Sequence, residues 1–151
     1  MGVRMIPSVA VVDRDATACM LMREICQSGG WNVVGCAHDA NEAMPLLSRA
    51  RPICLITGYN FDATATGLHL IHHARRLLPG LFTIIYTGWD INDVAAHITT
   101  DTPDRILRKP MPPHQLLELL DGVQSRVIRQ ARERERDQAA AIVRRSVLAA
   151  R

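Results

Sequence analysis

The chain has 151 residues, of which 48% are hydrophobic, 22% are charged and 4% are aromatic. This length and composition are typical of one folded domain with an appendage, and they exclude a largely disordered chain. No apolar run reaches the roughly eighteen residues needed to cross a membrane, and residues 1–7 lack the apolar core of a secretory signal. We therefore expect a cytoplasmic protein.

The net charge of +3 is unevenly distributed. Residues 126–151 hold eight arginines and three acidic residues, a charge of +5, which leaves −2 for the rest. This asymmetry predicts two parts, a domain over residues 1–123 and a basic helical extension over residues 124–151. Lys109 is the single lysine among seventeen arginines, so its position is informative.

Five short apolar runs predict β-strands, at residues 8–12, 31–37, 53–57, 82–87 and 105–108. Helical spacing of apolar residues between and after them predicts α-helices, at residues 16–28, 41–49, 67–78, 92–99 and from 114 onward. The alternation predicts an α/β fold, in which a five-stranded parallel sheet carries helices on both faces and an extended C-terminal helix follows.

Polar residues follow the predicted strands. Because the carboxyl ends of parallel strands meet at one edge of a sheet, we expect these residues to lie together and form a binding site. They are Asp13, Arg14, Asp15, Gly58, Thr87 and Lys109. The four cysteines form no C-x-x-C pair and have apolar neighbours, which predicts buried, reduced thiols at Cys19, Cys26, Cys36 and Cys54.

Over residues 8–123 the chain resembles the receiver (response-regulator, CheY-like) domain of two-component signalling. Residues 11–15 are similar to the acidic turn that binds Mg²⁺ in the family, and residues 52–60 to the third strand with its phosphoacceptor turn. Residues 84–88 are similar to the fourth strand with its switch threonine, here Thr87. Residues 107–110 are similar to the fifth strand with its lysine and proline, which a cis peptide bond joins in the family. The resemblance implies a flavodoxin-like fold and an Asp that accepts a phosphoryl group from a histidine kinase.

The chain departs from this family at the acceptor itself. Gly58 occupies the phosphoacceptor position and has no side chain to act as a nucleophile. Thr57 precedes it by one residue, so its side chain is expected on the opposite face of the strand. Ile106 occupies the position where the family places a switch aromatic. We therefore interpret the chain as a degenerate receiver with no catalytic residues, and we do not expect an enzyme.

The metal site is also altered, because Arg14 follows Asp13 and leaves Asp15 as the second acid. We expect Mg²⁺ binding by Asp13 and Asp15 to be weak or lost, and no other cofactor is indicated. Lys109 has three interpretations: a structural ion pair with Asp13, a retained site for an anion or ligand, or residual phosphorylation elsewhere in the pocket. A response regulator phosphorylated at an unusual acceptor, Asp15 or Asp62, is the alternative function.

The degenerate pocket favours a signalling protein that acts by binding a protein partner, such as a histidine kinase or another signalling protein. We expect the partner surface to involve the fourth helix, fifth strand and fifth helix, including Trp89, Ile106 and Leu120. The clustered histidines of the third helix are predicted to lie on a solvated helix face, at His69, His72 and His73.

Residues 114–151 would span about 57 Å as one helix, at 1.5 Å per residue. Such a helix reaches beyond a single small domain, so it pairs with a copy of itself or another partner, or it remains a solvated tail. A nucleic-acid-binding arginine helix is a third alternative. It is disfavoured because acidic residues interrupt the arginines and no aromatic side chain is available for base stacking, the acids being Glu133, Glu135 and Asp137.

Overall fold

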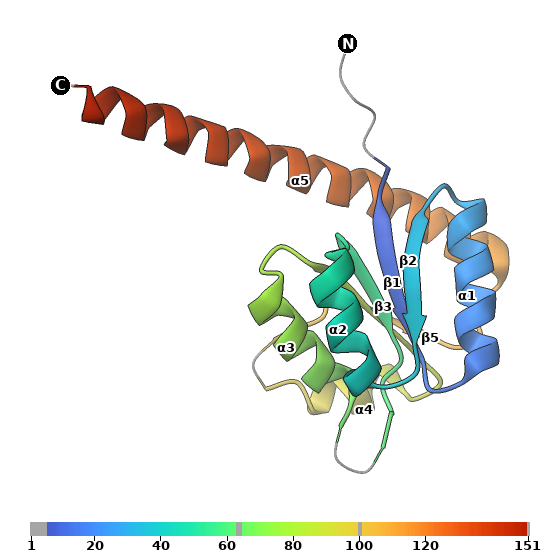
Figure 1. Cartoon of the computed structure of the whole chain (residues 1–151). Coiled ribbons are helices and arrows are strands. Elements are labelled where there is room, and N and C mark those ends of the chain that lie inside the picture. The colour runs from blue at the N-terminus through green and yellow to red at the C-terminus, as the bar shows by residue number, and fades with distance from the viewer. Residues whose placement is uncertain (1–5, 63–64, 100, 151) are drawn as a thin grey trace.

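The computed structural model describes residues 6–62, 65–99 and 101–150. Five parallel strands form one sheet in the order β2-β1-β3-β4-β5 (Figure 1). The predicted α/β fold is thereby confirmed. The strands are β1 (Ser8–Val12), β2 (Asn32–Ala37), β3 (Cys54–Thr57), β4 (Phe82–Thr87) and β5 (Arg105–Arg108).

Five helices connect and follow the strands: α1 (Ala16–Ser28), α2 (Ala40–Ala50), α3 (Gly67–Leu77), α4 (Ile91–Ala96) and α5 (Pro113–Ala149). The N-cap residues of α1, α2 and α4 are Asp15, Asp39 and Asp90. Each carboxylate accepts a backbone N–H from the first turn of its helix. The prediction that α4 continues to residue 99 is wrong. The backbone amides of His97 and Ile98 bond three residues back, to Val94 and Ala95, and this tight turn ends the helix.

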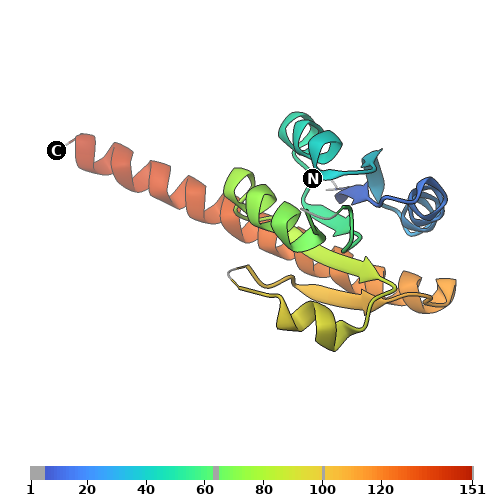
Figure 2. The same ribbon diagram turned by 90° about the horizontal axis from the view of Figure 1, so that it is seen from below.

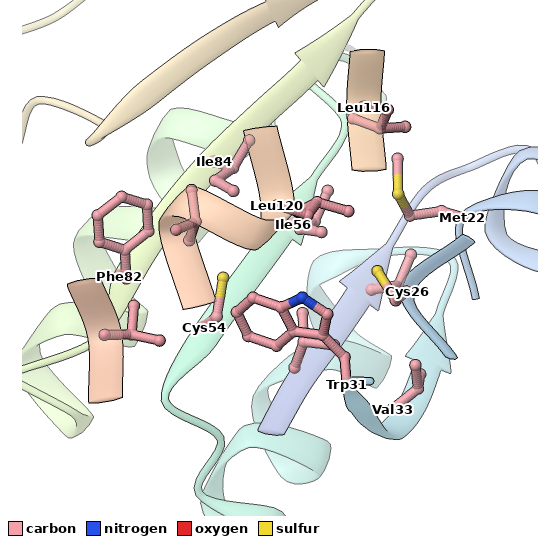
Figure 3. Close-up of a cluster of buried hydrophobic side chains, with 14 of the residues drawn as sticks. Met22, Cys26, Trp31, Val33, Cys54, Ile56, Phe82, Ile84, Leu116 and Leu120 are labelled. Carbon is pink, nitrogen blue, oxygen red and sulfur yellow. The ribbon is translucent and has the colours of Figure 1, made fainter. Parts of the chain in front are cut away.

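Helices α1 and α5 cover one face of the sheet (Figures 1 and 2). Alternate strand residues point to this face, because successive side chains of a strand lie on opposite sides. Figure 3 shows how side chains from both helices meet the strands around Trp31 and Phe82. We call this the α1–α5 layer.

Helices α2, α3 and α4 cover the opposite face, which we call the α2–α4 layer. The intervening strand residues face this layer, for example Val12, Leu55 and Ile85, each at most 1% exposed. Parallel strands covered on both faces explain why β1, β3 and β4 are almost continuous apolar runs.

The first half of α5 belongs to the α1–α5 layer, and this corrects one prediction. Leu120 was expected on a partner surface, but it is 1% exposed and lies in the layer beside Leu116 (Figure 3). The reason is the 4-3-4 spacing of the apolar residues of α5, which turns one stripe of the helix toward the sheet. The stripe continues through Val123 to Val127, so the packed part of α5 extends past residue 123. Beyond it, α5 projects away from the sheet as one unbroken helix (Figures 1 and 2).

All four cysteines are free thiols; Cys36 is half-buried and the others are buried. The expected burial is confirmed for Cys19, Cys26 and Cys54, whereas Cys36 is only half-buried. Burial raises the pKa of Cys19 to about 11 and that of Cys26 to about 12, and it raises the pKa of Cys54 well above the ordinary value. These thiols therefore act as small apolar side chains of the layers.

In the part of the chain that the structure describes, no helix combines the length and the apolar character that a membrane crossing requires.

Candidate functional site

A cavity of about 270 Å³ lies at the carboxyl ends of β1, β3, β4 and β5. The strands end in register there, because Val12 pairs with Thr57 and Thr87 pairs with Arg108. The residues that follow each strand therefore meet at one edge of the sheet, which we call the rim. All six residues that the sequence placed at this edge line the cavity, namely Asp13, Arg14, Asp15, Gly58, Thr87 and Lys109.

An ion pair joins the two sides of the cavity. Lys109 Nζ donates to Asp13 Oδ2 over 2.7 Å, and the two side chains are 30% and 16% exposed. The other carboxylate oxygen, Asp13 Oδ1, accepts the backbone N–H of Asp15 at 2.9 Å. The structure thus contains the contact between Lys109 and Asp13 that one of the three interpretations of the single lysine expected. Both oxygens of Asp13 have a partner within the chain.

Gly58 follows β3, and the space that a side chain at this position would occupy is free. A Cβ placed on Gly58 would lie 3.5 Å from Asp13 Oδ2 and 3.6 Å from its Cγ, which is ordinary van der Waals contact. A longer side chain at position 58 would thus enter the cavity beside Asp13 without displacing the backbone. Position 58 has the geometry of a pocket residue but lacks the side chain.

Thr57 cannot replace the missing side chain. Its hydroxyl donates to the carbonyl oxygen of Gly58 at 2.9 Å, and it is fully buried. It stands opposite Val12 of the α2–α4 layer, on the far side of the sheet from Ile56. The sequence argument from strand alternation predicted this orientation.

The two residues after Asp13 each make a side-chain hydrogen bond. Asp15 Oδ1 accepts the backbone N–H of Thr17 at 2.8 Å and so caps α1. Arg14 Nη1 donates to the carbonyl oxygen of Phe61, in the segment after β3, at 3.5 Å. The capping role of Asp15 was missed by the sequence analysis, although an Asp just before a helical run is a known signal for an N-cap.

These donors do not fit the Mg²⁺ ion that receivers bind. A hard octahedral cation needs several oxygen ligands, with carboxylates prominent among them. Position 58 supplies none, one Asp13 oxygen contacts an ammonium group, and the Asp15 carboxylate caps a helix. Among the described residues, no group of three His, Cys, Asp or Glu side chains is arranged to hold a metal ion.

The remaining rim residues come from β4, β5 and the loops that follow them. Thr87 is buried, and its Oγ1 accepts the backbone N–H of Trp89 at 3.1 Å. Trp89 is 48% exposed and packs edge-on against Tyr59, with ring centroids 5.7 Å apart. Ile106 is half-buried against the α2–α4 layer. Trp89 is therefore accessible to a partner, and Ile106 is accessible in part.

Tyr86 is one of the lining residues that the sequence analysis did not assign to the pocket. Its hydroxyl accepts the backbone N–H of Met111 at 3.2 Å, and the Lys109 ammonium lies 5.3 Å from its ring centroid. The peptide bond between Lys109 and Pro110 is cis, as the resemblance implied. No sequence signal distinguishes Tyr86 from other apolar residues of a buried strand.

The start of α3 lies close to the end of β3. Gly67 donates its backbone N–H to the Tyr59 carbonyl oxygen at 2.6 Å, and a Cβ on Gly67 would overlap the carbonyl oxygen of Gly58. Only glycine allows α3 to begin so close to the end of β3. Asp62 lies in this loop, where its Oδ1 accepts the backbone N–H of Ala65 at 2.8 Å. It is not among the described residues that line the cavity.

The histidines of α3 differ from one another. His69 Nδ1 accepts the backbone N–H of Thr66 at 3.1 Å and completes a capping box, while His73 is exposed. His72 Nδ1 lies 2.5 Å from Asp101 Oδ2. The expected solvated face thus holds for His69 and His73, but His72 has a carboxylate partner from the segment before β5 that the sequence did not reveal.

Comparison with known proteins identifies the family to which this fold belongs. The model of the response regulator receiver domain matches residues 9–121. A CheY-like receiver domain protein from Methanospirillum hungatei is 20% identical with a TM-score of 0.74, covering 83% of this chain and 99% of that one. The REC domain of AraT, a response regulator from Geobacillus stearothermophilus, is 28% identical with a TM-score of 0.74, covering 84% and 99%.

The anti-anti-sigma factor PhyR from Bartonella quintana is 15% identical with a TM-score of 0.69, covering 87% of this chain and 52% of that one. Among curated proteins, none matches this chain. The receiver model spans well over half of the chain and ends within α5, at the residue after Leu120. This chain therefore belongs to the response regulator receiver domain family.

Proposed function

We propose that this receiver domain of two-component signalling is a pseudo-receiver, which works by binding a protein partner and not by accepting a phosphoryl group. The observation that carries the proposal is Gly58. It stands where a side chain would point at Asp13 and it offers no nucleophile. Phosphoryl transfer to a receiver requires a carboxylate at that place, so the pocket lacks the group on which the reaction depends.

The contacts within the pocket support the same interpretation. Lys109, which would pair with a phosphoryl group, already contacts the Asp13 carboxylate at 2.7 Å. The Thr87 hydroxyl accepts a backbone N–H from Trp89, so it is engaged without a ligand. Asp13 and Lys109 thus have partners within the chain without phosphate or Mg²⁺. In this proposal the retained lysine fixes the ends of β1 and β5, and Mg²⁺ binding is weak or lost.

We further propose that the partner, a histidine kinase or another signalling protein, binds on the side of α4 and β5. Trp89 offers an exposed aromatic side chain there, and Ile106 is half-buried. A surface ion pair, Arg108 Nη1 to Asp90 Oδ2 at 3.2 Å, flanks them. Exposed aromatic residues beside arginine are favoured at the centres of protein interfaces. Leu120 is buried and takes no part in this surface.

The test is phosphorylation in vitro, read as intact mass after incubation with Mg²⁺ and acetyl phosphate. We expect the native chain to gain no phosphoryl group. The Gly58→Asp variant is expected to gain one, because its side chain has room beside Asp13. Gly58→Asn is the matched control, since it has the same size and no carboxylate.

A native chain that gains a phosphoryl group would refute the proposal. Mapping the modified residue would then identify an unusual acceptor, with Asp15 and Asp62 examined first. If neither the native chain nor Gly58→Asp gains one, the missing nucleophile is not the reason for inactivity, and the argument from Gly58 fails.

A further inference from the structure

The projecting half of α5 carries large apolar side chains in water. Ile142, Val143 and Val147 are 63%, 60% and 53% exposed. Figures 1 and 2, which view the molecule from two directions, both show this part of the helix extending beyond the sheet and its other helices. Such a run of exposed apolar residues on one element is typical of an interaction site.

These side chains form one stripe, at the spacing i, i+3, i+4, i+7, i+8 and i+11. The residues of this distal stripe are Ala139, Ile142, Val143, Ser146, Val147 and Ala150. At about 100° per residue they occupy one side of the helix, and Ile128 lies on the same side. Leu148 is equally exposed, at 69%, but it lies on the opposite side.

The distal stripe does not face the chain's own domain. The buried residues of α5, Leu116, Leu120, Val123 and Val127, define the side that contacts the sheet. The distal stripe is rotated from that side by about 140° around the helix axis. The guanidinium of Arg134 lies against Gly80, so the domain side of α5 is still occupied at residue 134. The domain therefore cannot cover the distal stripe, and it also does not block access to it.

Charged residues on the same side of α5 indicate what covers it. Between Ile128 and Ala139 this side presents three arginines and one acid, all exposed, namely Arg129, Arg132, Glu135 and Arg136. Two parallel helices in register would set Glu135 against Glu135 and Arg132 against Arg132, which like-charge repulsion disfavours. Two antiparallel helices with the two-fold axis between residues 135 and 136 set Glu135 of each copy against Arg136 of the other.

The same antiparallel register brings together one apolar pair at each end of the contact, while Ile142 lies level with Arg129 of the other copy. It sets Ile128 of one copy against Val143 of the other, and Arg132 against the small side chain of Ala139. It is the isologous arrangement of a two-fold dimer, in which the same surface serves both copies. We propose that a second copy of this chain covers the distal stripe, as an antiparallel pair of α5 helices centred between Glu135 and Arg136. This pairing does not depend on the chemistry of the pocket, so it stands or falls separately from the pseudo-receiver.

The first experiment measures the mass of the full chain in solution by sedimentation equilibrium, after nuclease treatment. We expect the native chain to be a dimer at about 100 µM, and the Val143→Glu variant to dimerise at least about tenfold more weakly, because this change places a charge against Ile128 of the other copy. Leu148→Glu is the matched control, since it adds the same charge within two turns of the same helix but on the side away from the stripe. A native chain that remains a monomer at 100 µM overturns the proposal. Equal weakening by both variants also overturns it. A complex that disappears with nuclease treatment would point to nucleic acid and overturn it as well.

The second experiment tests the orientation. Glu135→Arg alone is expected to weaken the dimer, because it opposes Arg136 of the other copy, and Glu135→Arg combined with Arg136→Glu is expected to restore it. Mild oxidation of an Ile128→Cys, Val143→Cys double variant is expected to give a covalent dimer, while neither single variant does. The buried native cysteines supply the background, which the unmodified chain measures. A covalent dimer from Val143→Cys alone would establish a parallel pair and overturn the antiparallel one.

Discussion

The hydrophobic layers and the polar rim above them differ in how much the fold depends on them. Each layer joins helices to several strands through side chains that are almost fully buried. The rim is held by a few polar contacts between partly exposed groups, chiefly Asp13 with Lys109. Burial of apolar area supplies most of the free energy of folding, whereas an isolated, partly exposed ion pair supplies little. A receiver can therefore lose its acceptor side chain and keep its fold.

The largest expected effect comes from the α1–α5 layer. Leu120→Ala should lower the free energy of unfolding by about 2–5 kcal/mol, since it removes a fully buried side chain and leaves a cavity. Leu148→Ala is the control on the same helix, and it should change this free energy by less than about 0.5 kcal/mol because Leu148 is exposed. Urea unfolding of the two variants measures the difference. Similar losses in both would mean that the projecting half of α5 also stabilises the fold.

The layers were the more predictable region. Nearly continuous apolar runs gave the strands to within a residue, because a strand buried on both faces tolerates few polar side chains. The predicted start of β2 at Trp31 differs from the observed start at Asn32, since the Trp31 amide bonds to Cys26 at the end of α1. Leu120 was misplaced because a surface known from the family was assumed before the buried side of α5 was established.

At the rim, the sequence identified which residues meet but not how each is engaged. Their position at strand ends predicted that Asp13, Gly58 and Lys109 come together, because parallel strands share one edge. The contacts of Tyr86 with Met111, and of His72 with Asp101, join residues far apart in the sequence. No local pattern encodes such pairs, so only the tertiary structure could reveal them.

The second effect, smaller than that of Leu120→Ala, concerns the ion pair of the rim. Lys109→Met should lower the free energy of unfolding by about 1–2 kcal/mol, because it leaves the mostly buried Asp13 carboxylate without its ammonium partner. Adding Asp13→Asn should recover part of the loss, and the double-mutant cycle gives the coupling energy of the pair. A loss as large as that of Leu120→Ala would contradict the weak dependence of the fold on the rim.

The smallest effect tests the layers through pH. Burial raises the pKa of Cys19 to about 11 and that of Cys26 to about 12, from an ordinary value of 9.0. The folded chain therefore keeps thiol protons that the unfolded chain releases. The stability due to the protonated thiols is fully present below about pH 9 and is lost progressively as the pH rises toward 11 and 12. At pH 9 each such thiol should already lower the free energy of unfolding by about 0.4 kcal/mol.

Cys26→Ala isolates this contribution, because it removes one buried thiol and leaves the other titrating groups in place. We expect its free energy of unfolding to fall less between pH 7 and pH 9 than that of the native chain, by about 0.4 kcal/mol. Comparing the two slopes cancels the titration of the histidines and of the rim, which both chains share. Identical slopes would mean that Cys26 ionises as easily in the folded chain as in the unfolded one. Water would then reach Cys26 in the α1–α5 layer. The contrast between a fully buried layer and a partly exposed rim would not hold.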